Sequence, residues 1–281
     1  MTTAQFTLEL FCHVDDAMKV ALPEQKKHAQ ALLYPSEVVT LGMLFALKGV
    51  GNRAFYRWLQ ANFADFFPHL PERTRLFRLL AAHQDQAQHF LAKPSLLGVV
   101  DSYGIELIHP RREGRSHKQI GKKGKSNLRW IVGAKLCYIL DHLGRVVDWA
   151  VDTANVYDGT FHPLIEKYDG QMLVLGDSGF HIKPTPAKAK PKLAELVPER
   201  KDPANLKICP RGTWNDRMVI ETVLSMLTGT CHLKKVGHRV WSGLKARLAF
   251  TLAAFNVCSQ WNGLQAGENG FVALSLLEVI L

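Results

Sequence analysis

Three runs rich in β-branched and aromatic residues limit what this chain can fold into. They are LLGVVDSYGIELI at 96–108, RWIVGAKLCYIL at 129–140 and RVVDWAVDTA at 145–154. Such residues pack well on a pleated, half-buried surface. The DHLG segment between the second and third runs is typical of a hairpin turn. We therefore expect three antiparallel strands in the middle of the chain.

After these runs the chain is expected to alternate between helix and strand. Short apolar segments bounded by Pro, Gly and Asp predict a helix at 159–168, a fourth strand at 171–177, a helix at 191–197, a fifth strand at 204–210 and helices near 216–228 and 241–261. The resulting order, βββαβαβα, predicts an α/β fold in which a mixed sheet has helices on both faces. Sites in such sheets lie at strand ends, where the connections diverge.

Residues 24–92 have the pattern of a small helical bundle interrupted by Pro and Gly. One segment carries an apolar face at helical spacing, made of Phe55, Trp58, Leu59 and Phe63. The next carries arginines that are expected to point outward, Arg73, Arg75 and Arg78. A bundle of this kind can bind DNA or can serve for packing and dimerisation, and the sequence leaves both open.

The charge of the chain is strongly positive. Lys and Arg number 35 against 25 Asp and Glu, which gives a net charge of +10 and favours an anionic partner such as nucleic acid. The longest apolar runs, at 248–258 and 271–281, are about half the roughly 20 residues of a membrane-spanning helix. The five scattered cysteines predict buried thiols and no disulfide framework. We expect a cytoplasmic protein without membrane association.

Two acids end apolar runs in the same way. Asp101 in GVVDSYG and Asp177 in VLGDSGF each precede a serine and a turn glycine. If the first and fourth strands are neighbours, the two carboxylates emerge about 4.8 Å apart, which suits shared ligation of divalent cations. Glu221 lies beside the apolar stripe of the helix near 216–228 and is the candidate third ligand. The alternative is two structural turns and a surface ion pair between Arg217 and Glu221.

The three motifs VVDSYG, VLGDSGF and WNDRMVIETVLSML resemble those of DDE insertion-sequence transposases, over about residues 36–262. The resemblance implies a ribonuclease H-like catalytic domain in which Asp101, Asp177 and Glu221 are catalytic and hold two Mg²⁺ ions, for which Mn²⁺ can substitute. It also implies an enzyme that cuts transposon ends and joins them to target DNA by two-metal phosphoryl transfer. Its partners would be double-stranded DNA and a second copy of the chain, in a homodimer associated with the nucleoid.

The resemblance divides the chain into an N-terminal helical DNA-binding or dimerisation domain at 1–93, a ribonuclease H-like catalytic domain at 94–265 and a tail at 266–281. The last motif departs from the family pattern, because Thr228 stands where a lysine is usual, with Lys234 and Lys235 just beyond it. Two alternatives stay open. One is a hydrolytic nuclease of the same fold, and the other is a catalytically inactive DNA-binding derivative.

A basic stretch at 111–129 carries eight Lys or Arg, a single acid and three glycines that would loosen the backbone. A phosphate backbone held there would pass close to Asp101, although a solvated loop is the alternative. Asp158 reads as an N-cap for the helix that follows it. Together with a clamp one turn before Glu221, the stretch gives these candidate DNA-binding residues: Arg111, Arg112, Arg115, Lys118, Lys122, Lys123, Lys125, Arg129, Trp214 and Arg217.

Overall fold

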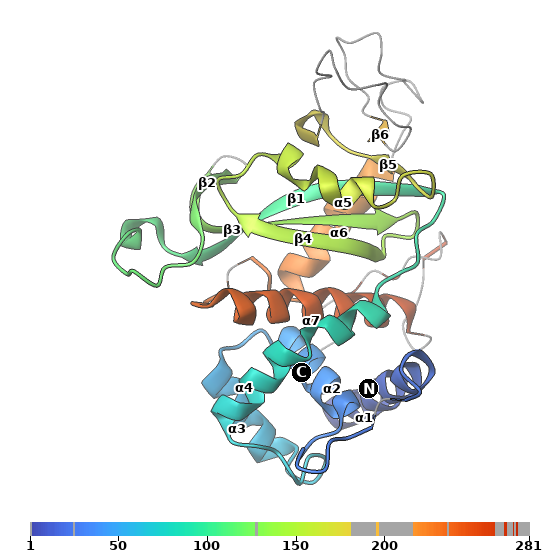
Figure 1. Ribbon diagram of the computed structural model, residues 1–281, viewed down its shortest axis with the longest axis vertical. Coiled ribbons are helices and arrows are strands. Elements are labelled where there is room, and N and C mark those ends of the chain that lie inside the picture. The colour runs from blue at the N-terminus through green and yellow to red at the C-terminus, as the bar shows by residue number, and fades with distance from the viewer. Residues whose placement is uncertain are drawn as a thin grey trace.

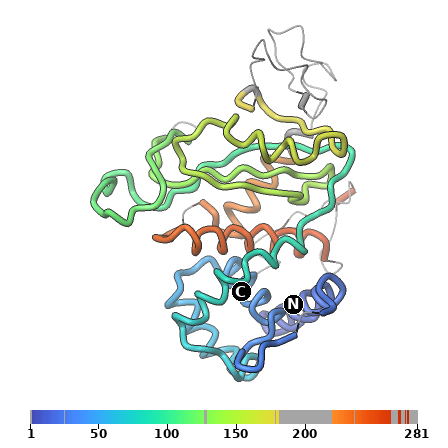
Figure 2. The backbone as a smooth tube through the Cα atoms, viewed as in Figure 1, coloured from blue at the N-terminus to red at the C-terminus, as the bar shows by residue number. Residues whose placement is uncertain are grey.

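The computed structural model describes residues 2–24, 26–126, 129–180, 195–196, 216–234, 236–261, 267–268, 272 and 274. Its elements form layers, with the N-terminal helices at one end, the sheet at the other and the long helix α7 (Trp241–Gln260) between them (Figure 1). Figure 2 traces the chain from the N-terminal helices past α7 and into the first strand of the sheet. The predicted acid Asp101 and the arginines Arg73, Arg75 and Arg78 are therefore carried by different layers.

The N-terminal layer contains four α-helices and a 3₁₀ helix. Their bounds are α1 Thr3–Ala21, α2 Pro35–Lys48, α3 Asn52–Asn62, α4 Arg73–Ala82 and η1 Gln84–Phe90. The predicted bundle is confirmed, but α1 lies before the range that the sequence indicated. It begins at a capping box in which Thr2 and Gln5 satisfy each other's backbone N–H groups. The predicted apolar face is confirmed by the burial of Phe55, Leu59 and Phe63.

Helix α7 is buried on nearly every side from Leu244 to Ser259. Two of its polar side chains bond to neighbouring elements. Arg247 donates to the carbonyls of Phe45 and Ala46 in the last turn of α2, where helix carbonyls have no partner in their own helix. Asn256 pairs with both backbone groups of Val146 on the sheet side. One helix therefore fastens the N-terminal layer to the sheet.

The sheet has six strands. They are β1 Leu97–Ile108, β2 Lys122–Ser126, β3 Arg129–Asp141, β4 Val146–Thr153, β5 Leu173–Leu175 and β6 Glu195–Leu196. β3 pairs antiparallel with β1 along one edge and with β2 and β4 along the other. β5 and β6 continue the sheet beyond β1 as parallel strands. The predicted antiparallel strands and the parallel fourth strand are confirmed as a mixed α/β arrangement.

Two parts of the predicted order are wrong. The basic stretch expected as a loop contributes β2, because glycine lets its backbone come close to its neighbours: a Cβ on Gly124 would stand 1.9 Å from the carbonyl oxygen of Ala154. The helix expected at 191–197 is also wrong where the structure describes it. Glu195 and Leu196 pair with β5 as a strand, which shows that sheet pairing prevails over local helix propensity. The strand predicted at 204–210 lies outside the described residues.

The two faces of the sheet belong to different hydrophobic clusters. Val99, Ile105 and Tyr138 join the large core that contains α7, the N-terminal helices and the buried side of α6 (Asp216–Gly229). Val100 and Cys137 join a smaller cluster with the 3₁₀ helix η3 (Asp158–Phe161) and α5 (His162–Glu166). Because the large core continues from the N-terminal helices to the sheet, the domain boundary near residue 93 stays a prediction.

In the part of the chain that the structure describes, no helix has the length and apolar character needed to span a bilayer. The described cysteines are free thiols. Cys137, Cys231 and Cys258 are buried as predicted, whereas Cys12 is exposed on α1, so the prediction of a buried thiol is wrong there. The exposed face of an amphipathic helix accounts for that position.

Candidate functional site

Asp101 in β1 and Asp177 just after β5 each stand two residues beyond the last pair of two adjacent parallel strands. Leu97 pairs with Leu173, and Val99 pairs with Leu175 as the last pair of this ladder. Asp101 and Asp177 each follow that last pair by two residues, so both reach the same level of the sheet. Neighbouring strands are about 4.8 Å apart. The expectation that the first and fourth strands are neighbours is confirmed.

A tight turn holds the second acid. After β5 the chain enters the short 3₁₀ helix η4 (Ser178–Phe180), and the backbone N–H of Gly179 donates to Asp177 Oδ1 at 2.8 Å. Asp101 Oδ1 accepts in the same way from the N–H of the next residue, Ser102, at 2.7 Å. Both carboxylates are half-exposed. Each is therefore oriented by nearby backbone while remaining accessible to solvent.

Asp101 and Ser102 lie on opposite faces of the sheet. Side chains alternate along a strand, so Asp101 shares the face of Val99, where α6 packs against β1. Ser102 shares the face of Val100, toward η3. The third predicted acid, Glu221, is carried by α6 and is exposed. Within the described ranges, no three or more His, Cys, Asp or Glu side chains are grouped so that they could hold a metal ion.

A polar network on the other face of β1 was missed by the sequence interpretation. Asp158 Oδ1 accepts hydrogen bonds from Ser102 Oγ at 2.5 Å and from Lys135 Nζ at 3.1 Å. The N-cap interpretation of Asp158 is wrong: Asp158 is the first residue of η3, Tyr157 occupies the cap position and no side-chain cap bond forms. No signal within the local sequence identifies partners that are 56 and 23 positions away.

These acids act electrostatically on the buried strand next to them. Burial raises the pKa of the Cys137 thiol well above its usual range, and the charges of Asp101 and Asp158 raise it further. Burial, followed by the charge of Asp101, likewise raises the pKa of Tyr138. Both groups stay neutral at ordinary pH. Asp101 and Asp158 therefore dominate the local charge, and Lys135 is the cation paired with Asp158.

The predicted DNA-binding residues of the basic stretch are exposed. Two of them have acidic partners, because Arg129 pairs with Glu106 at 3.5 Å and Lys123 lies 3.9 Å from Glu113. Trp214 lies outside the described residues, and for Arg217 the structure describes the backbone in α6 alone. The remaining exposed residues of the set are Arg111, Arg112, Arg115, Lys118, Lys122 and Lys125.

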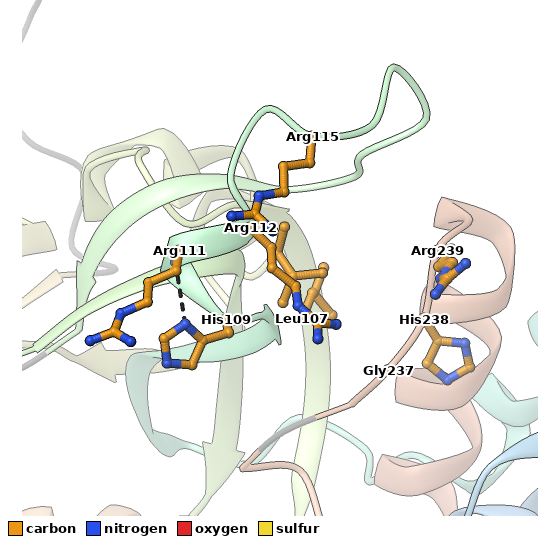
Figure 3. Close-up of a pocket in the computed structure, with 9 residues that line it drawn as sticks. Leu107, His109, Arg111, Arg112, Arg115, Gly237, His238 and Arg239 are labelled. Carbon is orange, nitrogen blue, oxygen red and sulfur yellow. Dashed lines mark hydrogen bonds between the residues drawn. The ribbon is translucent and has the colours of Figure 1, made fainter.

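Three of these arginines line a cavity of about 640 Å³ between the basic stretch and the segment before α7. Figure 3 shows Arg111, Arg112 and Arg115 on one side, with His238 and Arg239 on the other. No acid is among the described residues that line this cavity. Sequence interpretation missed Arg239, which is far from the basic stretch in the chain and lies in no charge run.

A second cavity, of about 690 Å³, adjoins the first and extends the arginine-lined surface to the N-terminal helices. The two share Gly237, His238 and Arg239, and the second is also lined by Arg73 and Arg78 of α4. Burial lowers the pKa of His238 to about 4, with a further contribution from the charge of Arg247. His238 is therefore neutral near pH 7, so the positive charge of the surface comes from arginine.

Two acids that follow the last pair of adjacent parallel strands, in a chain that also carries cavities lined by arginines, are typical of enzymes that act on nucleic acids. The particular family follows from comparison of the sequence. The family model described as "Transposase DDE domain" matches residues 92–241, which is more than half of the chain. The chain therefore belongs to the transposase DDE family, whose members cut DNA and transfer the cut strands. No curated protein matches the chain at a significant level.

Proposed function

We propose that this protein is an insertion-sequence transposase that cuts the ends of its element and joins them to target DNA through a ribonuclease H-like domain. The observation that carries the proposal is that Asp101 and Asp177 each follow the last pair of β1 and β5 by two residues, in a chain of the transposase DDE family. Acids at the ends of parallel strands reach the same edge of a sheet, where α/β sites lie. DNA as substrate implies action at the nucleoid.

Asp101, Asp177 and Glu221 are the proposed ligands of two Mg²⁺ ions, which Mn²⁺ would replace. Carboxylate oxygens fit the preference of Mg²⁺, and the pairing of β1 with β5 supports Asp101 and Asp177 as neighbouring ligands. Support for Glu221 is less direct: its helix packs against β1, on the face to which Asp101 belongs. When bound, such ions supply activation of the attacking oxygen and stabilisation of the leaving oxygen in an in-line phosphoryl transfer.

The protein's own residues would hold and orient the DNA. Arg111, Arg112 and Arg115 offer planar groups that bind phosphate oxygens in pairs, and Arg239 extends this set across the first cavity. The second cavity continues it to α4, which favours the DNA-binding role for residues 1–93. Cutting two element ends together requires them to be held in one assembly, so a homodimer forms part of the proposal.

The experiment that tests this function is incubation of the full-length protein with labelled terminal DNA and Mg²⁺. Cleavage at the element end, followed by joining of pre-cut ends to a second DNA, is the expected result. Cleavage without joining would favour the hydrolytic nuclease. Binding without either reaction would favour the inactive derivative. Replacing Glu221 by Gln should abolish cleavage and leave DNA affinity largely unchanged, because the variant removes one charge and keeps the shape of the side chain.

A further inference from the structure

The carboxylate of Asp158 contacts both acidic motifs. One oxygen accepts from the hydroxyl of Ser102, the residue that follows Asp101. The other oxygen lies against Gly179, the residue whose backbone N–H orients Asp177. The serine of VVDSYG and the second glycine of VLGDSGF thus meet at a third acid, which comes from a different part of the chain.

Gly179 is pressed between two carboxylates. A Cβ at this position would stand 2.7 Å from Asp158 Oδ2 and 3.0 Å from Asp177 Oδ1. Contacts this short force neighbouring atoms to move. Gly179 is not one of the described glycines with a positive φ. Glycine is therefore required here because neighbouring atoms come too close for a Cβ. The turn after β5 is therefore shaped by the position of Asp158.

Lys135 makes this position of Asp158 energetically acceptable. Its Nζ lies 3.1 Å from Asp158 Oδ1, and the two side chains are only 14% and 25% exposed. Three carboxylates near one another repel, and a partly buried charge without a partner is unfavourable. The ammonium group of Lys135 offsets the negative charge of Asp158. The other two of the three negative charges are those of Asp101 and Asp177.

We propose that Asp158 is a positioning residue that fixes the Asp101 motif and the Asp177 turn relative to each other, with Lys135 as its counter-ion. The effect of this positioning on metal binding rests on the proposed function, since the two acids that Asp158 fixes are the proposed metal ligands. The linkage through Ser102 and Gly179 is a separate claim about the protein without metal. Groups that orient metal ligands typically affect metal affinity by about 10- to 100-fold.

The first test measures hydrogen–deuterium exchange of the full chain by mass spectrometry, without metal. Asp158→Ala should raise exchange in peptides covering 172–180 and 101–103, because both segments lose their common contact. The matched control is Asp148→Ala. Asp148 pairs with Lys167 at a similar distance of 3.0 Å and also accepts from Tyr168, and neither partner belongs to an acidic motif. Unchanged exchange at 172–180 in Asp158→Ala would overturn the inference.

The second test measures Mn²⁺ affinity by calorimetry. Asp158→Asn keeps an acceptor for Ser102 and removes the charge that Lys135 pairs with, and it should weaken Mn²⁺ binding about 10-fold or more, while Asp148→Asn changes it less than about twofold. Gly179→Ala should act like Asp158→Asn. Gly229→Ala is its control, since a Cβ there meets nothing within 4 Å. Unchanged affinity in Asp158→Asn would overturn the positioning role.

The two tests separate this inference from the proposed function. If the wild-type protein binds no Mn²⁺, or if Asp101→Asn binds it as well as the wild type does, the proposed metal site fails. The exchange measurement still decides whether Asp158 links the two segments. If exchange rises and affinity falls in the Asp158 variants but not in the matched Asp148 variants, both the linkage and its role at the acids are supported.

Discussion

Polar groups serve different purposes in the core around α7 and in the acidic site. Asn256 and Arg247 are fully buried and bond to backbone groups of neighbouring elements. Asp101 and Asp177 are half-exposed, and the bonds described for them are to adjacent backbone N–H groups. Bonds to distant backbone stabilise the fold, whereas partly exposed carboxylates oriented by adjacent backbone are suited to contact a bound metal ion or substrate. Substitutions in the two regions should therefore separate stability from activity.

The largest effect is expected at the acids. Asp101→Asn or Asp177→Asn should lower the rate of DNA cleavage about a thousandfold or more, because each removes a charged ligand worth several kcal/mol to the transition state. The double variant should be little worse than either single variant, since the two act as a unit. Cleavage of labelled end DNA measures the rate. Thermal melting should show nearly unchanged stability, and an equal loss in Asp148→Asn would contradict the assignment.

A large loss of stability is expected at Asn256. Replacement by Ala removes the acceptor of the Val146 N–H and the amide donor to the carbonyl of Phe90, while the carbonyl of Val146 keeps the N–H of Ala92. It should lower the free energy of unfolding by about 2–4 kcal/mol. Denaturant unfolding measures it. Ser259→Ala is the control, because this buried hydroxyl on α7 bonds to the carbonyl of Phe255 in the same helix. Comparable losses in the two variants would refute the special role of Asn256.

His238 lies just before α7, in the lining of both cavities, and should make stability sensitive to acid. Its pKa in the folded protein is about 4, below the usual value of 6.5. Below pH 6.5 the unfolded chain therefore takes up a proton that the folded chain resists. Stability should be complete above pH 6.5 and should fall as the pH drops toward 4, by on the order of 2 kcal/mol.

Melting temperature against pH measures this dependence. His238→Gln should flatten the acid limb without removing it, because burial also lowers the pKa of His83 and of His232. An acid limb of the same steepness in the variant would show that other groups cause the loss. The comparison uses the slope of melting temperature against pH and not the melting temperature itself, because the substitution also removes the ring contact of His238 with Phe45.

The smallest effect is expected at the arginines of α4. Arg73→Ala and Arg78→Ala should each reduce the slope of log affinity against log salt by about 1, for the one phosphate contact that each removes. Arg75→Ala is the matched control, because Arg75 is exposed on the same helix and lines neither cavity. Filter binding of duplex DNA at several salt concentrations measures the slopes. Equal slopes for the Arg75 and the Arg73 and Arg78 variants would mean that the surface acts by net charge alone.

The strands that carry the acids could be predicted because their signals are local. β1, β3 and β4 each combine β-branched residues with a turn, and the two acids end apolar runs in the same way. The prediction that the two acids are neighbours in the sheet followed from the assumption that the first and fourth strands pair. The register confirms this pairing of the strands. β2 could not be predicted, because lysine and glycine are poor strand residues and its pairing with β3 decides its conformation.

The network around Asp158 could not be predicted for a related reason. Its partners Ser102 and Lys135 come from other strands, and the function of Gly179 depends on a contact that only the folded chain creates. Arg239 was missed because a single arginine has no pattern of its own. Periodicity identifies elements and their faces, whereas side-chain pairs between elements depend on how those elements pack.

The burial of α7 has one more consequence. Since this helix contacts both the sheet and the N-terminal layer along its length, neither layer can rotate without exposing apolar side chains. The separation between the arginines of α4 and the acids of β1 is then a constant of the molecule. If the arginines of α4 hold DNA as proposed, this fixed separation would set the number of base pairs between the held segment and the scissile bond.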